Sequence, residues 1–249
     1  MQAPHLVQPV LPRPLRPAGT PSGTTHGLAM PRVLLCDLDG TLVDTMPILA
    51  DLATDVLESV YGMPRSLGRE MYLATSGLPF WRQLEVICPG DARNGGAADR
   101  FERAKPERCR AARMAPDTRR VLADLQGRGV EIVVSSNNGV ENVESFARAS
   151  EFPFDLVLGH DGKGFGKGRP HVERAARVFA ATRDEMLFVG DSLHDGEIAL
   201  VEGMPFVGVA GTFAKESFAL RFPGLPVVHR FSELLYLFAD QSAVALAAT

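Results

Sequence analysis

Two acidic residues stand one residue apart where an apolar stretch ends, in the segment VLLCDLDGTLVDT at residues 33–45. Carboxylates this close repel each other unless a positive group lies between them. Asp37 and Asp39 are followed at once by Gly40 and Thr41, which turn the backbone at the end of the apolar run. The segment therefore predicts a site at which two carboxylates meet a cation and an anionic ligand.

Further polar residues follow two later apolar runs. Ser135, Ser136 and the pair Asn137-Asn138 end one run, and Asp191 and Asp195 belong to GDSLHDG after another. Taken alone, an Asp after a strand is usually a turn residue or a helix cap, and 136–138 could begin the next helix. Four carboxylates brought together without a compensating charge are costly, and a divalent cation removes that cost. Oxygen donors without a His or Cys cluster favour Mg²⁺.

The elements that would position these residues alternate between two patterns. The runs at 32–37, 130–136, 154–159, 185–191 and 205–211 have the continuous apolar character of buried strands. The segments at 117–129, 140–152 and 169–182 have helical spacing. The alternation predicts an α/β fold with a doubly wound parallel sheet, in which ligands bind at the carboxyl ends of the strands.

One interval breaks this alternation, because residues 46–115 contain no convincing strand. A helical stripe runs from Ile48 to Val60, with Asp44 or Thr45 as its N-cap and Gly62 as its end; we favour Asp44. Further helical pieces are predicted at 80–87 and 99–114. We expect a helical insertion at 46–115 within a core made of 30–45 and 116–240.

Composition narrows the class of protein. The 249 residues carry a net charge of −4, so the sequence lacks the excess of positive charge that is typical of proteins binding nucleic acid or anionic membranes. Three cysteines without metal-ligand spacing fit reduced thiols in a cytoplasmic protein. Residues 1–29 are rich in Pro, Gly, Ser and Thr and predict a disordered tail, with Met30 as an alternative start; 241–249 form a second tail. The oligomeric state is left open.

The motifs together resemble a known family. DLDGT at 37–41, the Ser136-Asn137 pair, a downstream lysine and GDSLHD at 190–195 resemble, in this order, the four motifs of the haloacid dehalogenase superfamily. The spacing is similar to that of the phosphoglycolate phosphatase-like and β-phosphoglucomutase-like subgroup, in which a helical cap lies between the first and second motifs. The resemblance runs from Arg32 to Phe238 and implies a Rossmann-like core with an inserted α-helical cap.

The resemblance also implies a mechanism. Asp37 would attack phosphorus and form an aspartyl-phosphate, and Asp39 would protonate the leaving alcohol and then activate water. Mg²⁺ would be held by Asp37, the backbone carbonyl of Asp39 and Asp191, with Asp195 farther from the ion.

The phosphoryl group would be held by a further set of residues, namely Gly40, Thr41, Ser136, Asn137 and a lysine. In this set Gly40, Thr41 and Asn137 would act through their backbone N–H groups. Lys167 is preferred as the lysine over Lys163, because its run leads directly into a helix. Ser136 is preferred over Ser135, which we expect to face the sheet interior.

The resemblance implies hydrolysis of a small-molecule phosphate monoester, with the cap choosing the leaving group. A dehalogenase would not need Asp39, because a halide leaving group needs no proton. A phosphonatase needs a lysine in the cap, and the cap lysine of this sequence, Lys105, lies outside any matching motif. Phe80, Trp81 and Arg82 are the candidate substrate contacts, although the two aromatic residues could simply pack the cap. A β-phosphoglucomutase-like phosphotransferase and a non-catalytic phosphate-binding module remain alternatives.

Two residues near the motifs have simpler interpretations. Cys36 precedes the nucleophile on a buried strand, and alternation predicts that it packs in the core. His194 lies within the fourth motif and is expected to be a solvated loop residue.

Overall fold

A six-stranded parallel sheet forms the centre of the molecule in a computed structural model that describes residues 28–238. Its strand order is β3-β2-β1-β4-β5-β6, so the order reverses at β1, which pairs with β2 on one side and β4 on the other. The strands are β1 (Val33–Cys36), β2 (Glu131–Gly139), β3 (Leu156–His160), β4 (Met186–Gly190), β5 (Phe206–Val209) and β6 (Val227–Val228). The predicted doubly wound α/β fold is confirmed.

Helices cover both faces of this sheet. One face carries α5 (Pro116–Gly127), α6 (Val140–Ser150) and α10 (Leu234–Leu237), and the other carries α7 (Arg169–Phe179), α8 (Leu193–Glu202) and α9 (Lys215–Arg221). Two 3₁₀ turns, η1 (Arg183–Glu185) and η2 (Phe231–Glu233), complete the core. In β1, Leu34 and Cys36 pack on the first face while Val33 and Leu35 pack on the second. Burial on both faces explains why the strands are continuous apolar runs.

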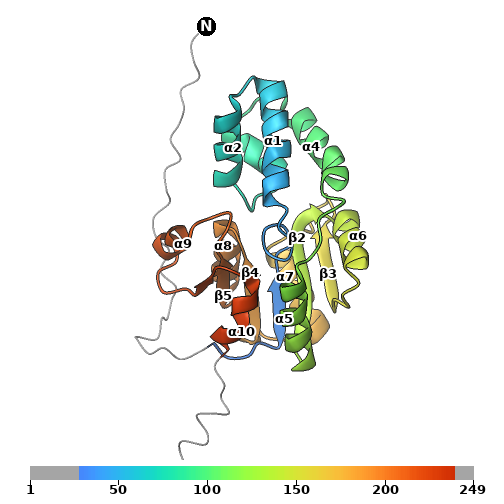
Figure 1. The fold of residues 1–249 in the computed structure, drawn as a ribbon, viewed down its shortest axis with the longest axis vertical. Coiled ribbons are helices and arrows are strands. Elements are labelled where there is room, and N and C mark those ends of the chain that lie inside the picture. The colour runs from blue at the N-terminus through green and yellow to red at the C-terminus, as the bar shows by residue number, and fades with distance from the viewer. Residues whose placement is uncertain (1–27, 239–249) are drawn as a thin grey trace, which may run out of the picture.

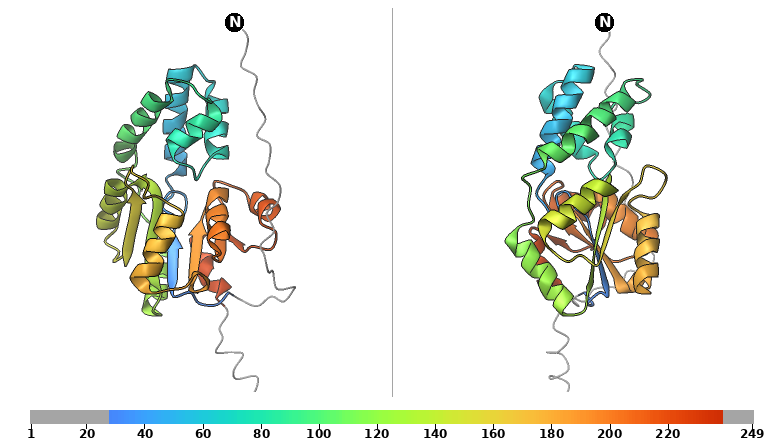
Figure 2. Two further views of the ribbon diagram at one scale, coloured as in Figure 1. Left: turned by 180° about the vertical axis from the view of Figure 1, so that it is seen from behind. Right: turned by 90° about the vertical axis from the view of Figure 1, so that its right-hand side faces the viewer.

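Four helices between β1 and β2 form a separate layer, which we call the helical insertion. They are α1 (Met46–Tyr61), α2 (Arg65–Ala74), α3 (Phe80–Ile87) and α4 (Asn94–Arg108). They share a hydrophobic core of their own and lie beyond the edge of the sheet at which β1 ends (Figures 1 and 2). Residues 46–115 contain helices and loops alone, as predicted. The division of the chain at 45/46 and 115/116 remains our proposal.

Of the two predicted N-caps of α1, the one that we favoured, Asp44, was wrong. Thr45, not Asp44, occupies the N-cap position, and no side chain caps the helix. The Thr45 hydroxyl instead donates to the carboxylate of Asp39 at 2.6 Å, and Pro47 removes one of the N–H groups that a cap could accept. The helix ends at Gly62, whose φ of 68° is the left-handed conformation that glycine adopts readily.

The predicted tails at 1–29 and 241–249 lie almost entirely outside the described residues. Within residues 28–238, we find no helix of the length and apolar character needed to cross a bilayer.

Candidate active site

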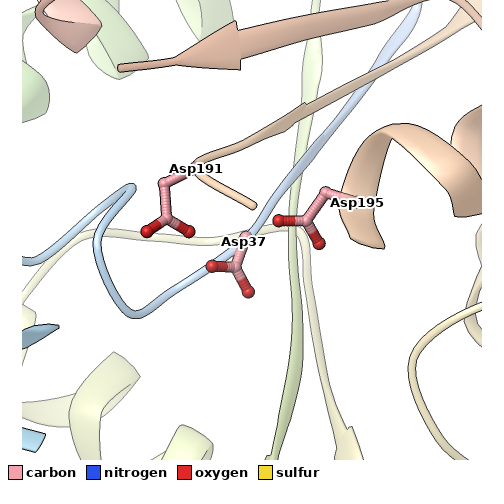
Figure 3. A group of neighbouring side chains, drawn as sticks. All are labelled: Asp37, Asp191 and Asp195. Carbon is pink, nitrogen blue, oxygen red and sulfur yellow. The ribbon is translucent and has the colours of Figure 1, made fainter. Parts of the chain in front are cut away.

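Three buried aspartates from two strand ends and one helix gather at the point where the strand order reverses. Asp37 follows β1, Asp191 follows β4, and Asp195 lies in the first turn of α8. One carboxylate oxygen of each lies within 4.8 Å of the others, and the three side chains stand side by side in Figure 3. A crevice at a reversal of strand order is where open parallel sheets bind ligands.

Lys167 is the cation that enters this cluster. Its side chain is 2% exposed, and its ammonium lies 2.5 Å from Asp37 Oδ1 and also contacts Asp195 Oδ1. One ammonium against three carboxylates leaves a surplus of negative charge. Burial, followed by the charge of Asp195, raises the pKa of Asp37 to about 7 against the opposing effect of Lys167. Burial and the charges of Asp37 and Asp195 likewise raise the pKa of Asp191 well above its usual range. The cluster therefore favours a bound cation.

The N-terminus of α8 fixes Asp195 in this cluster. The Asp195 N–H donates to the Ser192 hydroxyl oxygen and the Ser192 N–H donates to Asp195 Oδ2, both at 3.2 Å, which is a reciprocal capping box; the Ser192 hydroxyl also donates to Asp195 Oδ2 at 2.6 Å. The prediction for His194 was wrong, because it lies within α8 with its side chain 25% exposed and its Nδ1 at 3.7 Å from Glu197. The helix starts earlier than the loop-like sequence GDSLHD suggests.

Asp191 is held by two contacts that come from outside its own strand. Thr212, in the loop after β5, donates its hydroxyl to Asp191 Oδ2. The turn after β1 passes so close that a Cβ at Gly40 would overlap this carboxylate, and Gly40 also has a φ of 85°. Thr212 was missed from sequence, although it follows a predicted strand and so belongs to the same edge of the sheet.

Asp39 faces the helical insertion and is held by three side chains. Thr45 donates to Oδ1 at 2.6 Å, Asn138 donates to Oδ2 at 2.7 Å, and the ammonium of Lys105 lies 3.5 Å from Oδ2. Burial works to raise the pKa of Asp39, but the charge of Lys105 and the bonds from Thr45 and Asn138 outweigh it and lower the pKa. Asp39 and Asp37 are thus placed in opposite electrostatic environments.

Lys105 is the main residue of the site that sequence reasoning missed. It lies in α4 of the insertion, is buried, and donates to Asn138 Oδ1 of the core. The available signal was its position four residues after Phe101, which puts it on the buried face of α4. Lys105 and Asn138 therefore join the insertion to the core beside Asp39.

The predicted phosphate-binding residues are placed differently from one another. Ser136 is 2% exposed and lines the cavity above Asp37. Asn137 also lines it and donates its side-chain amide to the carbonyl of Gly77, in the insertion, at 2.7 Å. The N–H groups of Gly40 and Thr41 instead donate within the turn, to the carbonyls of Val43 and Leu38. These two N–H groups are therefore already bonded within the turn and do not point to a phosphoryl group as we expected.

The structure distinguishes between the two candidate lysines and between the two candidate serines. Lys163 is exposed, whereas Lys167 meets the aspartates. Ser135 points away from the cavity to His171, whose Nδ1 lies 2.9 Å from its hydroxyl, while His171 Nε2 lies 3.2 Å from the carbonyl of Gly159. A carbonyl only accepts, so Nε2 carries the proton and Ser135 donates to Nδ1.

Of the candidate substrate contacts on α3, Phe80 lines the cavity, whereas Trp81 and Arg82 do not. Phe80 lines the cavity but is only 3% exposed and stacks on Phe101 within the insertion. Trp81 is 52% exposed, and the Arg82 guanidinium lies over its ring. Neither Trp81 nor Arg82 lines the cavity.

The cavity between insertion and core is small. Its volume is about 60 Å³, and its floor is formed by Asp37, Asp39, Asp191 and Lys167. Tyr72, Gln83 and the loop at 76–79 are among the parts of the insertion that form its wall. A site of this size admits a small ligand beside buried carboxylates.

The fold and the site define a doubly wound α/β enzyme with a carboxylate cluster at its switch point, next to a helical layer. Residues 34–209 match the model of the haloacid dehalogenase-like hydrolases, and the chain belongs to this family. The expected family and the expected hydrolase class are both confirmed.

Known proteins similar to this chain agree with that assignment. A phosphoglycolate phosphatase of Photorhabdus laumondii is 29% identical over 218 residues, covering 82% of this chain and 91% of its own length. A protein of Haemophilus somnus described as a predicted phosphoglycolate phosphatase has a solved structure with a TM-score of 0.68, 22% identity and coverage of 86% and 100%. The CbbY protein of Rhodobacter sphaeroides, solved with xylulose-1,5-bisphosphate, has a TM-score of 0.64 at 17% identity, covering 82% and 96%.

Proposed function

We propose that this chain is a Mg²⁺-dependent phosphatase that hydrolyses a small-molecule phosphate monoester through an aspartyl-phosphate on Asp37. The observation that carries the proposal is the pairing of Asp37 with Lys167 inside a cluster of three buried carboxylates, next to an Asp39 in a separate environment. A nucleophile, a cation for the phosphoryl group and a separate acid are the groups that a two-step phosphoryl transfer needs.

Asp37 attacks phosphorus in line, and the bond from phosphorus to the leaving oxygen breaks as the bond to the carboxylate forms. Lys167 neutralises the carboxylate before attack and contacts the phosphoryl oxygens afterwards. The Ser136 hydroxyl, which lines the cavity, donates to a phosphoryl oxygen. The N–H groups of Leu38 and Asp39 are free of backbone bonds among the described residues, and we assign them the role that we expected of Gly40 and Thr41.

Asp39 gives a proton to the leaving alcohol and then accepts one from the water that cleaves the aspartyl-phosphate. Lys105 lowers the pKa of this carboxyl, whereas the negative charge of a bound phosphate raises it. Thr45 and Asn138 hold the two oxygens of Asp39 in place for both transfers. Asn138 is itself bonded by Lys105, so the contact that joins the insertion to the core also supports Asp39.

The donor set of the cluster fits Mg²⁺, because it consists of carboxylate oxygens alone and carries a surplus of negative charge. Asp37 and Asp191 would hold the ion together with the backbone carbonyl of Asp39, and Asp195, bound by Ser192 and Lys167, lies farther from it. When bound, the ion offsets the repulsion between nucleophile and phosphate.

The leaving group is a small-molecule alcohol in this proposal. The similarity to phosphoglycolate phosphatases makes phosphoglycolate the first substrate to test, and Lys105 provides a buried cation on the leaving-group side of the cavity. We also place the enzyme in the cytoplasm, on the grounds that its three cysteines are few and lack metal-ligand spacing.

The test is phosphate release from p-nitrophenyl phosphate and phosphoglycolate with Mg²⁺, by wild type and by Asp37→Asn. We expect turnover by wild type and a loss of at least about 10³-fold in the variant, since the nucleophile is removed. Equal release by both proteins would refute the role of Asp37. Binding of phosphate esters by both proteins without release from either would instead favour a non-catalytic phosphate-binding module.

A further inference from the structure

A second cavity lies on the other side of Asp39 from the presumed phosphoryl site. Its volume is about 300 Å³, compared with about 60 Å³ for the first. It is bounded by the end of α4 and the segment that follows, at 105–113, and by α6, which lies below α4 in Figure 1. We call it the rear pocket. Its size is within the range of pockets that bind small molecules.

The two cavities share one wall made of side chains. Asp39, Lys105 and Asn138 line both of them. These three are bonded to one another, Lys105 to Asn138 and Asn138 to Asp39, so they form a partition. Lys105 has a flexible four-carbon stem, so its side chain is the part of this partition that can move without the backbone.

The small cavity offers little room for a leaving group longer than a few atoms. A water-sized group needs about 10–15 Å³, so about 60 Å³ accommodates roughly four to six such groups. A phosphoryl group and a metal ion fill most of that space. The leaving oxygen must lie beside the carboxyl of Asp39 that protonates it, and this carboxyl faces the rear pocket as well.

The lining of the rear pocket indicates the chemistry of what would enter it. Leu38, Val43, Phe146 and Ala149 provide apolar surface. Arg110 and Arg113 add two cations beyond Lys105, while Asp39 is the one acid among the lining residues. Arg110 pairs with Glu107 at an exposed position and Arg113 donates to the carbonyls of Arg110 and Ala112, which leaves several of their five N–H donors for a ligand.

We propose that the rear pocket takes the distal part of the leaving group, and that the preferred substrate is a phosphate monoester with a short apolar chain ending in a carboxylate or another anion. The chain lies on the apolar floor and the terminal anion meets Arg110 and Arg113. This inference rests on the proposed phosphatase and specifies its substrate class: phosphoglycolate is accepted, but it is too short to reach the arginines.

A homologous series of esters tests the proposal. The substrates are the phosphate esters of 2-hydroxyacetate, 4-hydroxybutanoate and 6-hydroxyhexanoate, together with n-hexyl phosphate, which has the length without the charge. We expect kcat/KM to rise at least tenfold from the shortest acid to the best longer one, and n-hexyl phosphate to fall below the acid of equal length. A kcat/KM that is highest for phosphoglycolate would overturn the proposal.

Two sets of variants separate length from charge. Ala149→Phe fills the pocket and removes the gain with chain length, whereas Glu144→Phe, at an exposed position of the same helix that does not line the pocket, retains it. The double variant Arg110→Ala with Arg113→Ala lowers kcat/KM for the longer acids to that for n-hexyl phosphate. Arg120→Ala, which removes an exposed arginine of α5, does not. Equal effects of a pocket variant and its control would contradict the proposal.

A binding measurement distinguishes failure of this inference from failure of the phosphatase assignment. The four esters are titrated into Asp37→Asn with Mg²⁺ by calorimetry, which requires no turnover. Tighter binding of the longer acids, lost in Asp37→Asn with Ala149→Phe, supports the rear pocket even if wild type hydrolyses none of them. Equal affinity for all four esters overturns it even if wild type hydrolyses them all.

Discussion

Lys105 connects the helical insertion to the residue that we propose as the acid and base of the reaction. Its ammonium bonds Asn138, which in turn bonds Asp39, so a side chain from α4 controls how a core carboxylate is held. A buried charge-assisted hydrogen bond contributes about 1.5–3 kcal/mol. The orientation of Asp39 therefore depends on the insertion being seated on the core.

We predict that Lys105→Ala lowers kcat/KM by about 10- to 100-fold, because Asn138 and Asp39 lose the cation that positions them. The measurement is steady-state kinetics with p-nitrophenyl phosphate, alongside the thermal unfolding temperature. Lys215→Ala, which removes an exposed lysine of α9, is the matched control and should match wild type. An unchanged kcat/KM in Lys105→Ala would contradict the role.

His171 gives the molecule a pH-dependent stability that is separate from its chemistry. The ring is fully buried between Ser135 and Gly159. Burial lowers the pKa of His171 to about 4, against an ordinary value of 6.5. In the unfolded chain His171 binds a proton below about pH 6.5, whereas in the folded protein it does so only below about pH 4. The contribution of the neutral ring to the free energy of unfolding is therefore complete above pH 6.5 and is lost as the pH falls.

We predict that the free energy of unfolding falls by about 3 kcal/mol between pH 6.5 and 4 on account of His171. Urea unfolding at a series of pH values measures it. His171→Asn can keep the bond from Ser135 without titrating, and should flatten this part of the curve. His229→Asn, at an exposed position, should leave the curve as in wild type; the same slope in all three proteins would refute the assignment.

The loop between α2 and α3 is one of the places where the insertion packs closely on the core. Gly77 has a φ of 95°, its carbonyl accepts from Asn137, and a Cβ at this position would meet Ser192 and would lie 2.8 Å from the Cβ of His194. Both of these neighbours belong to the N-terminus of α8. A side chain at residue 77 must therefore push the loop away from the core.

We predict that Gly77→Ala lowers kcat/KM at least tenfold with little loss of thermal stability, because the insertion keeps its own core but no longer seats on α8. Gly90→Ala is the matched control, since Gly90 also has a positive φ, of 68°, but its Cβ would enter open space. Kinetics and thermal unfolding of both variants make the comparison. Equal kinetics in the two variants would show that strain alone, and not the contact with α8, is responsible.

The elements and the strand-end residues could be predicted from sequence because their signals are local. Asp37 and Asp191 end continuous apolar runs, and parallel strands bring their carboxyl ends to one edge. Thr212 also follows a predicted strand, but its bond to Asp191, like the contacts of Lys105, depends on how segments far apart along the chain pack together. The N-cap that we favoured for α1 was wrong for the same reason, since the hydroxyl of Thr45 is drawn to Asp39 by tertiary contact.

At the scale of the whole molecule, the buried acid cluster should make stability depend on Mg²⁺. Three carboxylates with one ammonium are destabilising without a cation, and an ion that binds the folded state alone adds about 2.7 kcal/mol at one hundred times its Kd. We predict a rise of about 5–10 °C in Tm under that condition. Differential scanning calorimetry with EDTA and with Mg²⁺ measures it.

Asp191→Asn is the informative variant for this metal dependence. It removes one of the repelling charges, so it should raise the Tm measured in EDTA and reduce the rise caused by Mg²⁺. Asp184→Asn, at an acidic residue near the surface of the core, should do neither. A full Mg²⁺ response in Asp191→Asn would exclude Asp191 as a ligand.

The strand order also has a consequence for synthesis of the chain. β1 is made first yet lies in the middle of the sheet, where it needs both β2 and β4 as neighbours. The insertion that follows it has its own core and can fold while β1 waits. A nascent chain that has not reached Met186 therefore presents one side of an apolar strand without a partner, the kind of edge that invites aggregation. We expect chaperones to engage ribosome-bound chains of this length most strongly, and to leave when β4 emerges.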